Sequence, residues 1–413
     1  MTTTTLATAS GRRWQPFHLV VGLCFAAVFI SYIDRTNISV AAIPMKDQFG
    51  WTETVKGFVL SSFFIGYLIL QIAAGTLANR LGGKLVLGVA VVWWSAFTML
   101  TPPAATVSLG ALIAARIALG LGEAAVFPAS INMVGCWVPA ESRSRAVAVF
   151  SSALSLGTVV SLPVTGWLVR SYGWPVPFYA FGALGLVWAA IWFTRIGRQG
   201  PFDARSETVR SIPWGAIVRT PAVWAIVVNH FCHNWALYLL LAWLPTYFKT
   251  TFGISLASAG LYSAAPWLVS FLMANVAGSL ADRVLKRGMS PTAVRKLIEG
   301  LGLLGAALFL LLLRQAGSVT AGVALMCGAT GMLAFCMAGF APNAFDVAPK
   351  YADVIWGISN TFGTVPGIVG VAVTGWLVDR TGSFTAPFLL TAGVCLLGAL
   401  VYFAFGSGRR QIV

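Results

Sequence analysis

Long apolar stretches alternate with short polar connections along the whole chain of 413 residues. A stretch of about 20 apolar residues is long enough to cross a hydrocarbon core of roughly 30 Å as a helix. A backbone in lipid must satisfy its own hydrogen bonds, and the alternating pattern of barrel strands is absent, so each stretch is predicted to be a helix. We expect twelve helices, at residues 18–42, 54–78, 85–101, 106–136, 146–169, 177–195, 220–248, 256–281, 297–314, 319–347, 354–378 and 385–406.

Two repeats divide the chain into halves. Val164–Val169 (VTGWLV) recurs letter for letter at Val373–Val378, and Gly75–Arg80 (GTLANR) is similar to Gly278–Arg283 (GSLADR). We therefore predict an all-α integral membrane protein with two six-helix halves in parallel orientation, and a substrate site between them near the midplane. The expected parts are an N-terminal tail (1–17), a first half (18–195), a linker (196–219), a second half (220–406) and a C-terminal tail (407–413).

Composition and charge distribution agree with a membrane protein. The chain is 58% hydrophobic and 9% charged, with a net charge of +15. The predicted tails and even-numbered loops hold 19 of the 27 basic residues, and the odd-numbered loops hold 6. This asymmetry predicts that both termini are cytoplasmic, and it explains the basic excess without nucleic acid. We also expect a multi-pass protein of a cell's inner membrane that acts as a monomer. The six cysteines lack metal-ligand spacing, so no metal or other cofactor is expected.

Four charged residues interrupt the apolar segments. They are Asp34 and Arg35 in the first predicted helix, and Arg116 and Glu123 in the fourth. A charge at membrane depth costs at least ~2.5–3.5 kcal/mol, so such residues usually face a cavity or a partner with a function. Asp34 and Arg35 project about 100° apart, whereas Arg116 and Glu123 share one helix face about 10 Å apart. Together they predict a site that binds a charged solute and moves protons.

The residue types suggest a division of roles. Arginine binds a carboxylate through two parallel hydrogen bonds, which suits Arg35 and Arg116 to an anionic substrate. An ionised carboxyl group is costly in apolar surroundings, so Asp34 and Glu123 suit the binding and release of protons. A purely structural ion-pair network between helices is the alternative for all four.

Several motifs resemble a known family. Gly75–Lys84 (GTLANRLGGK) is similar to the signature loop of the major facilitator superfamily, although Asn79 replaces the usual acidic residue. Within that superfamily the chain resembles the anion:cation symporter family, which includes bacterial sugar-acid and phthalate transporters, sialin and the vesicular glutamate transporters. The motifs that carry this resemblance are Asp34–Asn37 (DRTN), Ser62–Gln71, Arg116–Glu123, Asn234–Tyr247, Asp346–Tyr351 and Trp356–Thr361.

The resemblance implies proton-coupled symport of an organic anion by alternating access, with the proton as coupling ion and no cofactor. It implies that Arg35 and Arg116 neutralise the substrate carboxylate and that Asp34 and Glu123 titrate. It also implies that the pocket is lined by Tyr32, Tyr67 and Asn360.

The chain departs from the vesicular glutamate transporters in two places. Leu60 stands where they have a histidine, and His233 stands where they have an arginine. These departures favour a monoanion, such as a hexuronate, an aldonate or an aromatic carboxylate, over glutamate. His233 is an equal candidate for packing and for the pocket. Asn343 and Asn360 suit a hydroxyl-rich acid, so Asn343 is also placed in the pocket.

Other functions remain as competing hypotheses. An organic-acid or drug exporter that exchanges its substrate for protons would keep the same fold. A non-transporting membrane receptor for a sugar acid is the third hypothesis. An enzyme is not expected, because the sequence contains no nucleophile elbow, phosphate-binding loop or metal motif.

Overall fold

The computed structural model describes residues 16–197, 200–202 and 212–412. Most of the predicted N-terminal tail and part of the predicted linker lie outside these residues. The first half contains α1 (Pro16–Phe49), α2 (Glu53–Leu81), α3 (Gly83–Val107), α4 (Leu109–Glu123), α5 (Val126–Trp137), α6 (Arg143–Tyr172) and α7 (Pro175–Arg195). After α8 (Trp214–Arg219), the second half contains α9 (Pro221–Phe252), α10 (Leu256–Lys286), α11 (Pro291–Leu312), α12 (Val319–Leu333), α13 (Cys336–Val347), α14 (Ala352–Thr381) and α15 (Thr385–Phe405).

The twelve predicted membrane spans are confirmed, with local differences at their ends and in the fourth and tenth spans. The fourth span is α4 followed by α5, and the tenth is α12 followed by α13. Pro128 lacks the N–H group that would bond to the carbonyl of Ala124, which accounts for the break between α4 and α5. The fourth span also begins later than expected, because Ser108 caps α4 by accepting a hydrogen bond from the N–H of Ala111.

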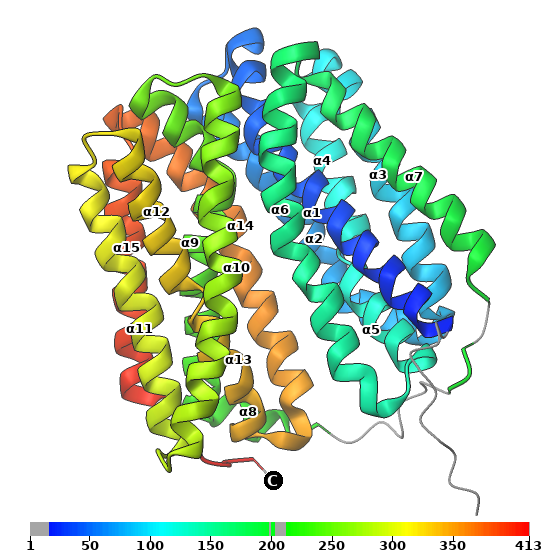
Figure 1. The fold of residues 1–413 in the computed structure, drawn as a ribbon, viewed down its shortest axis with the longest axis vertical. Helices are drawn as coiled ribbons and strands as arrows, with labels where there is room; N and C mark the ends of the chain where they lie inside the picture. Colours follow the sequence, from blue (N-terminus) through cyan, green and yellow to red (C-terminus); the bar gives the residue numbers. More distant parts are fainter. Residues whose placement is uncertain (1–15, 198–199, 203–211, 413) are drawn as a thin grey trace, which may run out of the picture.

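The two halves form neighbouring helical bundles (Figure 1). Their most extensive contacts pair α2 with α14 and α6 with α10. The short helix α8 and the C-terminal end lie at the lower end of the molecule in Figure 1, which we call the linker side. The other end is called the far side.

The VTGWLV repeat lies where the halves cross on the far side. Gly166 of the first copy faces the start of α10, where an added Cβ would lie 3.3 Å from the carbonyl oxygen of Leu256. Gly375, at the same position of the second copy, faces the start of α2, where a Cβ would lie 2.3 Å from the carbonyl oxygen of Glu53. The repeated glycine therefore lets the two halves approach closely at both crossings.

A carboxylate reinforces one of these crossings. Asp379 follows the second copy of the repeat and accepts the N–H groups of Glu53 at 2.8 Å and Thr54 at 2.6 Å, and also the hydroxyl of Thr54. These N–H groups belong to the first turn of α2, where the helix dipole favours an anion. Arg170 follows the first copy, and the described residues show no corresponding carboxylate contact at that crossing. Asp379 thus links the halves on the far side.

Replacing Asp379 with asparagine is expected to open the far side. Because Asp379 is itself exposed, losing the anion at the start of α2 removes about 0.3–1 kcal/mol of interaction, which shifts the balance between a closed and an open far side roughly 2- to 5-fold. Spin labels placed on the exposed far-side residues Ser171 and Thr251 report this shift as a population at longer separation in double electron–electron resonance.

Asp47→Asn is the matched control. Asp47 is also a far-side carboxylate and reaches across to Lys249, but this pair is exposed and its atoms are 3.9 Å apart. An exposed pair of this kind contributes little. Equal distance distributions for Asp379→Asn and Asp47→Asn would show that Asp379 does not hold the halves together.

Candidate functional site

A cavity of about 1280 Å³ lies between the halves and is lined by side chains from both. It reaches Arg35 in the interior and extends to the linker side, where its lining includes the exposed residues Asn79, Trp214 and Asp353. The helix crossings described above close the far side. The cavity is therefore accessible from the linker side.

A close crossing of α2 and α4 builds the first-half wall. A Cβ on Gly66 would lie 1.9 Å from the carbonyl oxygen of Ile117, and one on Gly120 would lie 2.0 Å from that of Phe63. No larger residue fits at these positions without moving a backbone. The crossing fixes Phe63 and its neighbours on α2 against the charged residues of α4.

Arg35 is the arginine that reaches the cavity. Its Nη2 and Nε atoms donate to Oε2 of Glu123 at 3.0 and 3.2 Å. Its Nη1 atom donates to the hydroxyl of Tyr32 at 3.4 Å. The guanidinium carbon also lies 4.7–4.8 Å from the ring centroids of Tyr32, Phe63 and Tyr67. Aromatic rings and one carboxylate thus hold the guanidinium in a fixed orientation at the cavity wall.

Arg116 lies deeper than Arg35. It is 1% exposed and lines a small separate space beside Arg35 and Phe63 rather than the large cavity. Its guanidinium carbon is 5.6 Å from the ring of Phe63, so this ring contacts both arginines. The Nε and Nη1 atoms of Arg116 have no hydrogen-bond partner among the described residues. The structure therefore brings only one of the two predicted arginines to the cavity.

The two predicted proton-binding carboxyl groups have different surroundings. Glu123 is bound by Arg35 and also accepts the hydroxyl of Ser31 at 2.9 Å. Asp34 is wholly buried near Trp94 and Thr98 of α3, and neither of its oxygen atoms has a hydrogen-bond partner among the described residues. Neither carboxyl group lines the large cavity. Glu123 thus holds Arg35 in place, whereas Asp34 has no ion pair of its own among the described residues.

The second half presents polar groups from α9 and α14 to the same cavity. His233 lines it, is 4% exposed, and its Nδ1 atom lacks a partner among the described residues. The neighbouring His230 shares a hydrogen bond of 2.7 Å with Ser359, and Asn234 donates to the carbonyl of Gly363 at 2.7 Å. The predicted pocket residues that line the cavity are Tyr32, Arg35, Tyr67, His233 and Asn360.

Asn343 is placed elsewhere. It is fully buried between α13 and α15, where its Nδ2 atom donates to the hydroxyl of Tyr402 at 2.7 Å. It does not line the large cavity in this structure. Its predicted contact with substrate is therefore not present in the state that the structure describes.

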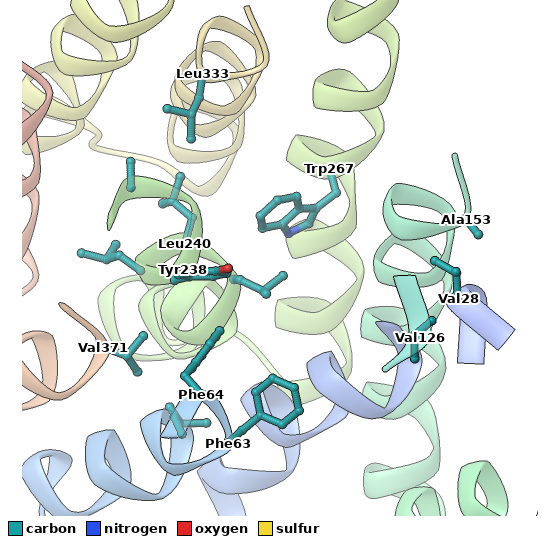
Figure 2. Close-up of a cluster of buried hydrophobic side chains, with 14 of the residues drawn as sticks. Val28, Phe63, Phe64, Val126, Ala153, Tyr238, Leu240, Trp267, Leu333 and Val371 are labelled. Atoms are coloured by element: carbon teal, nitrogen blue, oxygen red, sulfur yellow. The ribbon is translucent and has the colours of Figure 1, made fainter. Parts of the chain in front are cut away.

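Tyr238 of α9 is a cavity residue that the sequence analysis did not single out. Figure 2 shows it beside Phe63 and Phe64 of α2, and its ring centroid is 4.4 Å from that of Phe64. It lies within Asn234–Tyr247, the motif that had already been noted on α9. Ser31 of α1 was also not singled out, because a serine in a membrane helix has no distinctive pattern.

The Major Facilitator Superfamily profile matches residues 24–371. The chain belongs to the major facilitator superfamily. Members of this superfamily and the relatives below are transporters, not enzymes.

Curated relatives cover nearly the whole chain. A sodium-dependent phosphate transport protein from the chloroplast of Arabidopsis thaliana is 39% identical over 97% of this chain and 80% of its own length. A chloroplastic ascorbate transporter of the same plant is 38% identical over 97% of this chain and 76% of its own length. These relatives are consistent with the resemblance to the anion:cation symporter family.

Solved structures support the fold. A bacterial homologue of the lysosomal transporter Spinster, described as inward-facing and occupied, superposes with a TM-score of 0.82 at 17% identity, over 95% of this chain and 97% of its own. A D-xylose–proton symporter superposes with a TM-score of 0.78 at 16% identity, over 96% of this chain and 100% of its own. At these identities the likeness concerns the fold alone.

Proposed function

We propose that this protein is a secondary active transporter that couples the movement of an organic monoanion to protons. The observation that carries this proposal is the state of Arg35. Its guanidinium faces the cavity, and its donors are only partly used by Glu123 and by a long bond to Tyr32. A guanidinium has five N–H groups, so an anion entering the cavity finds free donors in a fixed orientation.

The opposite wall favours a hydroxyl-rich acid. His233, Asn234 and Asn360 provide polar atoms across the cavity from Arg35. A hexuronate or an aldonate has one carboxylate for the arginine and several hydroxyl groups for these side chains. Aromatic carboxylates are the second class, since Tyr32 and Tyr67 offer flat faces near the guanidinium. Phosphate and ascorbate, which appear in the names of the relatives, are small anions that the same arginine suits.

In the proposed cycle, Asp34 carries the coupling proton and Glu123 holds Arg35 in place. With the far side open, a proton binds to Asp34 and the anion binds to Arg35. The halves then rock about the helix crossings, and the cavity opens to the linker side, where anion and proton leave. In this proposal the linker side is cytoplasmic and the protein acts as a monomer in a cell's inner membrane. An organellar membrane is the alternative suggested by the chloroplastic relatives.

Export is the second candidate, and one observation favours it. The cavity, at about 1280 Å³, is larger than the roughly 300–1000 Å³ of a typical small-molecule site. A wide cavity admits substrates larger than a single sugar acid. An exporter of this kind would release protons inward and accept a broad range of compounds.

Uptake by purified protein in liposomes tests the proposal. An inward proton gradient is imposed, and the panel contains galactonate, glucuronate, phthalate, glutamate, ascorbate and phosphate in labelled form. Accumulation of one or two monoanions that a protonophore abolishes is the expected result. Uptake driven by sodium without a proton gradient, or gradient-dependent efflux of many unrelated compounds, would contradict proton symport.

A further inference from the structure

A third buried carboxyl group lies outside the cavity. Glu299 is on α11 and is 0% exposed. No residue of α11 is among the described residues that line the cavity. Glu299 was not predicted as a functional residue, and neither the anion site nor Asp34 and Glu123 involves it.

Glu299 has no cation to balance it. Neither Oε1 nor Oε2 has a described donor in good hydrogen-bond geometry, although the thiol of Cys336 and the backbone of Phe340 lie beside them. Arg295, one helical turn earlier, instead donates to Asp346 at 2.8 Å and to the carbonyl of Ala338 at 3.3 Å. A buried carboxylate without a partner is strongly unfavourable, whereas the neutral acid is tolerated in the same place. The surroundings therefore favour a protonated Glu299 in this state.

The titratable groups that the structure places around Glu299 come from α9, α11, α13 and α15, and among these described groups one is a cation. They are Arg295 of α11, Cys336 and Asp346 of α13, Cys395 and Tyr402 of α15, and Cys232 of α9. Because Asp346 already holds Arg295, the remaining groups are neutral or acidic. Because these neighbouring groups offer no free cation, Glu299 is more stable as the neutral acid than as one member of a permanent ion pair.

Two glycines shape the space for this carboxyl group. A Cβ on Gly339 of α13 would lie 2.2 Å from Oε2 of Glu299. A Cβ on Gly302 of α11 would lie 2.4 Å from Sγ of Cys336. The absence of side chains at these positions lets α11 and α13 pack directly around the acid. Any movement of α13 along α11 must therefore change the surroundings of Glu299.

One residue links this acid to the cavity. Phe340 of α13 follows Gly339, and its ring centroid lies 4.8 Å from that of His230 and 5.8 Å from that of His233. Both histidines line the cavity, and the backbone of Phe340 lies beside Glu299. Phe340 thus lies between the two cavity histidines and the buried acid.

We infer that Glu299 is a second proton-binding site, located in the second half and coupled to the transport cycle. This inference rests on the proposed function, because it concerns the coupling of that function to protons. The acid holds a proton when the cavity opens to the linker side. When α13 shifts and separates Asp346 from Arg295, the guanidinium becomes free to pair with Glu299 on its own helix, four residues away. The proton is then released.

Infrared difference spectroscopy tests this inference on purified full-length protein in detergent, without substrate. A protonated carboxylic acid has a C=O stretching band that disappears on ionisation. The expected result is a band that is lost reversibly when the buffer is changed from acidic to mildly alkaline. Glu299→Gln should remove this band, because the amide keeps the shape of the neutral acid but has no proton to lose. Glu299→Asp should shift the band rather than remove it.

The control is Glu141→Gln, which removes an exposed carboxyl group and should leave this band unchanged. If the Glu299 band persists throughout the pH range, the acid stays protonated and serves only as a structural hydrogen-bond donor. A spectrum unchanged by Glu299→Gln would show that the group is ionised throughout. Either result overturns the inference. Because the measurement uses no substrate, failure of proton-driven uptake would overturn the proposed function separately.

Discussion

Replacing Arg35 with alanine is expected to abolish anion uptake. The guanidinium is the cationic group of α1 that faces the cavity, and it is held by Glu123 and by three aromatic rings. Truncating one partner of a buried charge pair costs about 2–5 kcal/mol, which corresponds to a loss of roughly 30-fold or more in apparent affinity. The variant also leaves Glu123 buried without its partner. Initial rates of uptake in liposomes, measured over a range of anion concentrations, give the loss directly.

Arg35→Lys separates charge from geometry. Lysine keeps the positive charge but lacks the planar fork that binds a carboxylate through two bonds. We expect it to retain some uptake at high anion concentration, with an apparent affinity reduced roughly 10-fold or more, as for the loss of a hydrogen bond to a charged group. Arg170→Lys, at an exposed far-side position, is the matched control and should transport normally. Normal uptake by Arg35→Ala would show that the anion binds elsewhere.

The alternation of long apolar stretches and short polar connections predicted the helices well, because a lipid bilayer imposes simple rules on the length and composition of a membrane span. The exact VTGWLV repeat also predicted two equivalent halves, which the structure confirms. The purpose of the repeated glycine could not be predicted. Gly166 and Gly375 contact the starts of helices from the opposite half, and such a contact depends on how the halves are placed together.

The charged site was predicted only in part. Arg116 and Glu123 share a face of one span, as their spacing indicates, yet Glu123 pairs with Arg35 of α1 at 3.0 Å. Which arginine a carboxylate meets depends on how α1 packs against the fourth span, and the periodicity of a single helix contains no such information. The ring of Phe63 that contacts both arginines was likewise visible only as part of a motif.

Glu299 was not predicted from the sequence as a functional residue, for a related reason. The expected ninth helix began at residue 297, which placed this acid at a membrane boundary where charge is common. The structure begins α11 at Pro291, so Glu299 lies more than two turns inside the helix and is fully buried. A charged residue near a predicted boundary is therefore a candidate whenever a proline and a cap, here Pro291 and Ser290, lie further out.

Replacing Asp34 with asparagine is expected to uncouple transport from protons while leaving anion binding largely intact. The amide has nearly the shape of the acid, and its oxygen can still face the donors of Trp94 and Thr98, which lie beside Asp34 without forming a hydrogen bond of good geometry. It can neither bind nor release a proton. Under an inward proton gradient, accumulation should fall to equilibration, with an inside-to-outside ratio near one. Exchange of labelled for unlabelled anion across the same liposomes should remain within a few-fold of wild type.

Glu123→Gln provides the comparison that assigns the coupling group. Glu123 accepts from Arg35 and Ser31, so the amide leaves the guanidinium without its counter-charge and disturbs the anion site itself. Exchange and accumulation should therefore decline together in Glu123→Gln, whereas only accumulation should decline in Asp34→Asn. If Asp34→Asn still concentrates the anion under a pH gradient, then Asp34 does not carry the coupling proton. The opposite pattern, with exchange intact only in Glu123→Gln, would transfer that role to Glu123 and make its bond to Arg35 the switch that the proton controls.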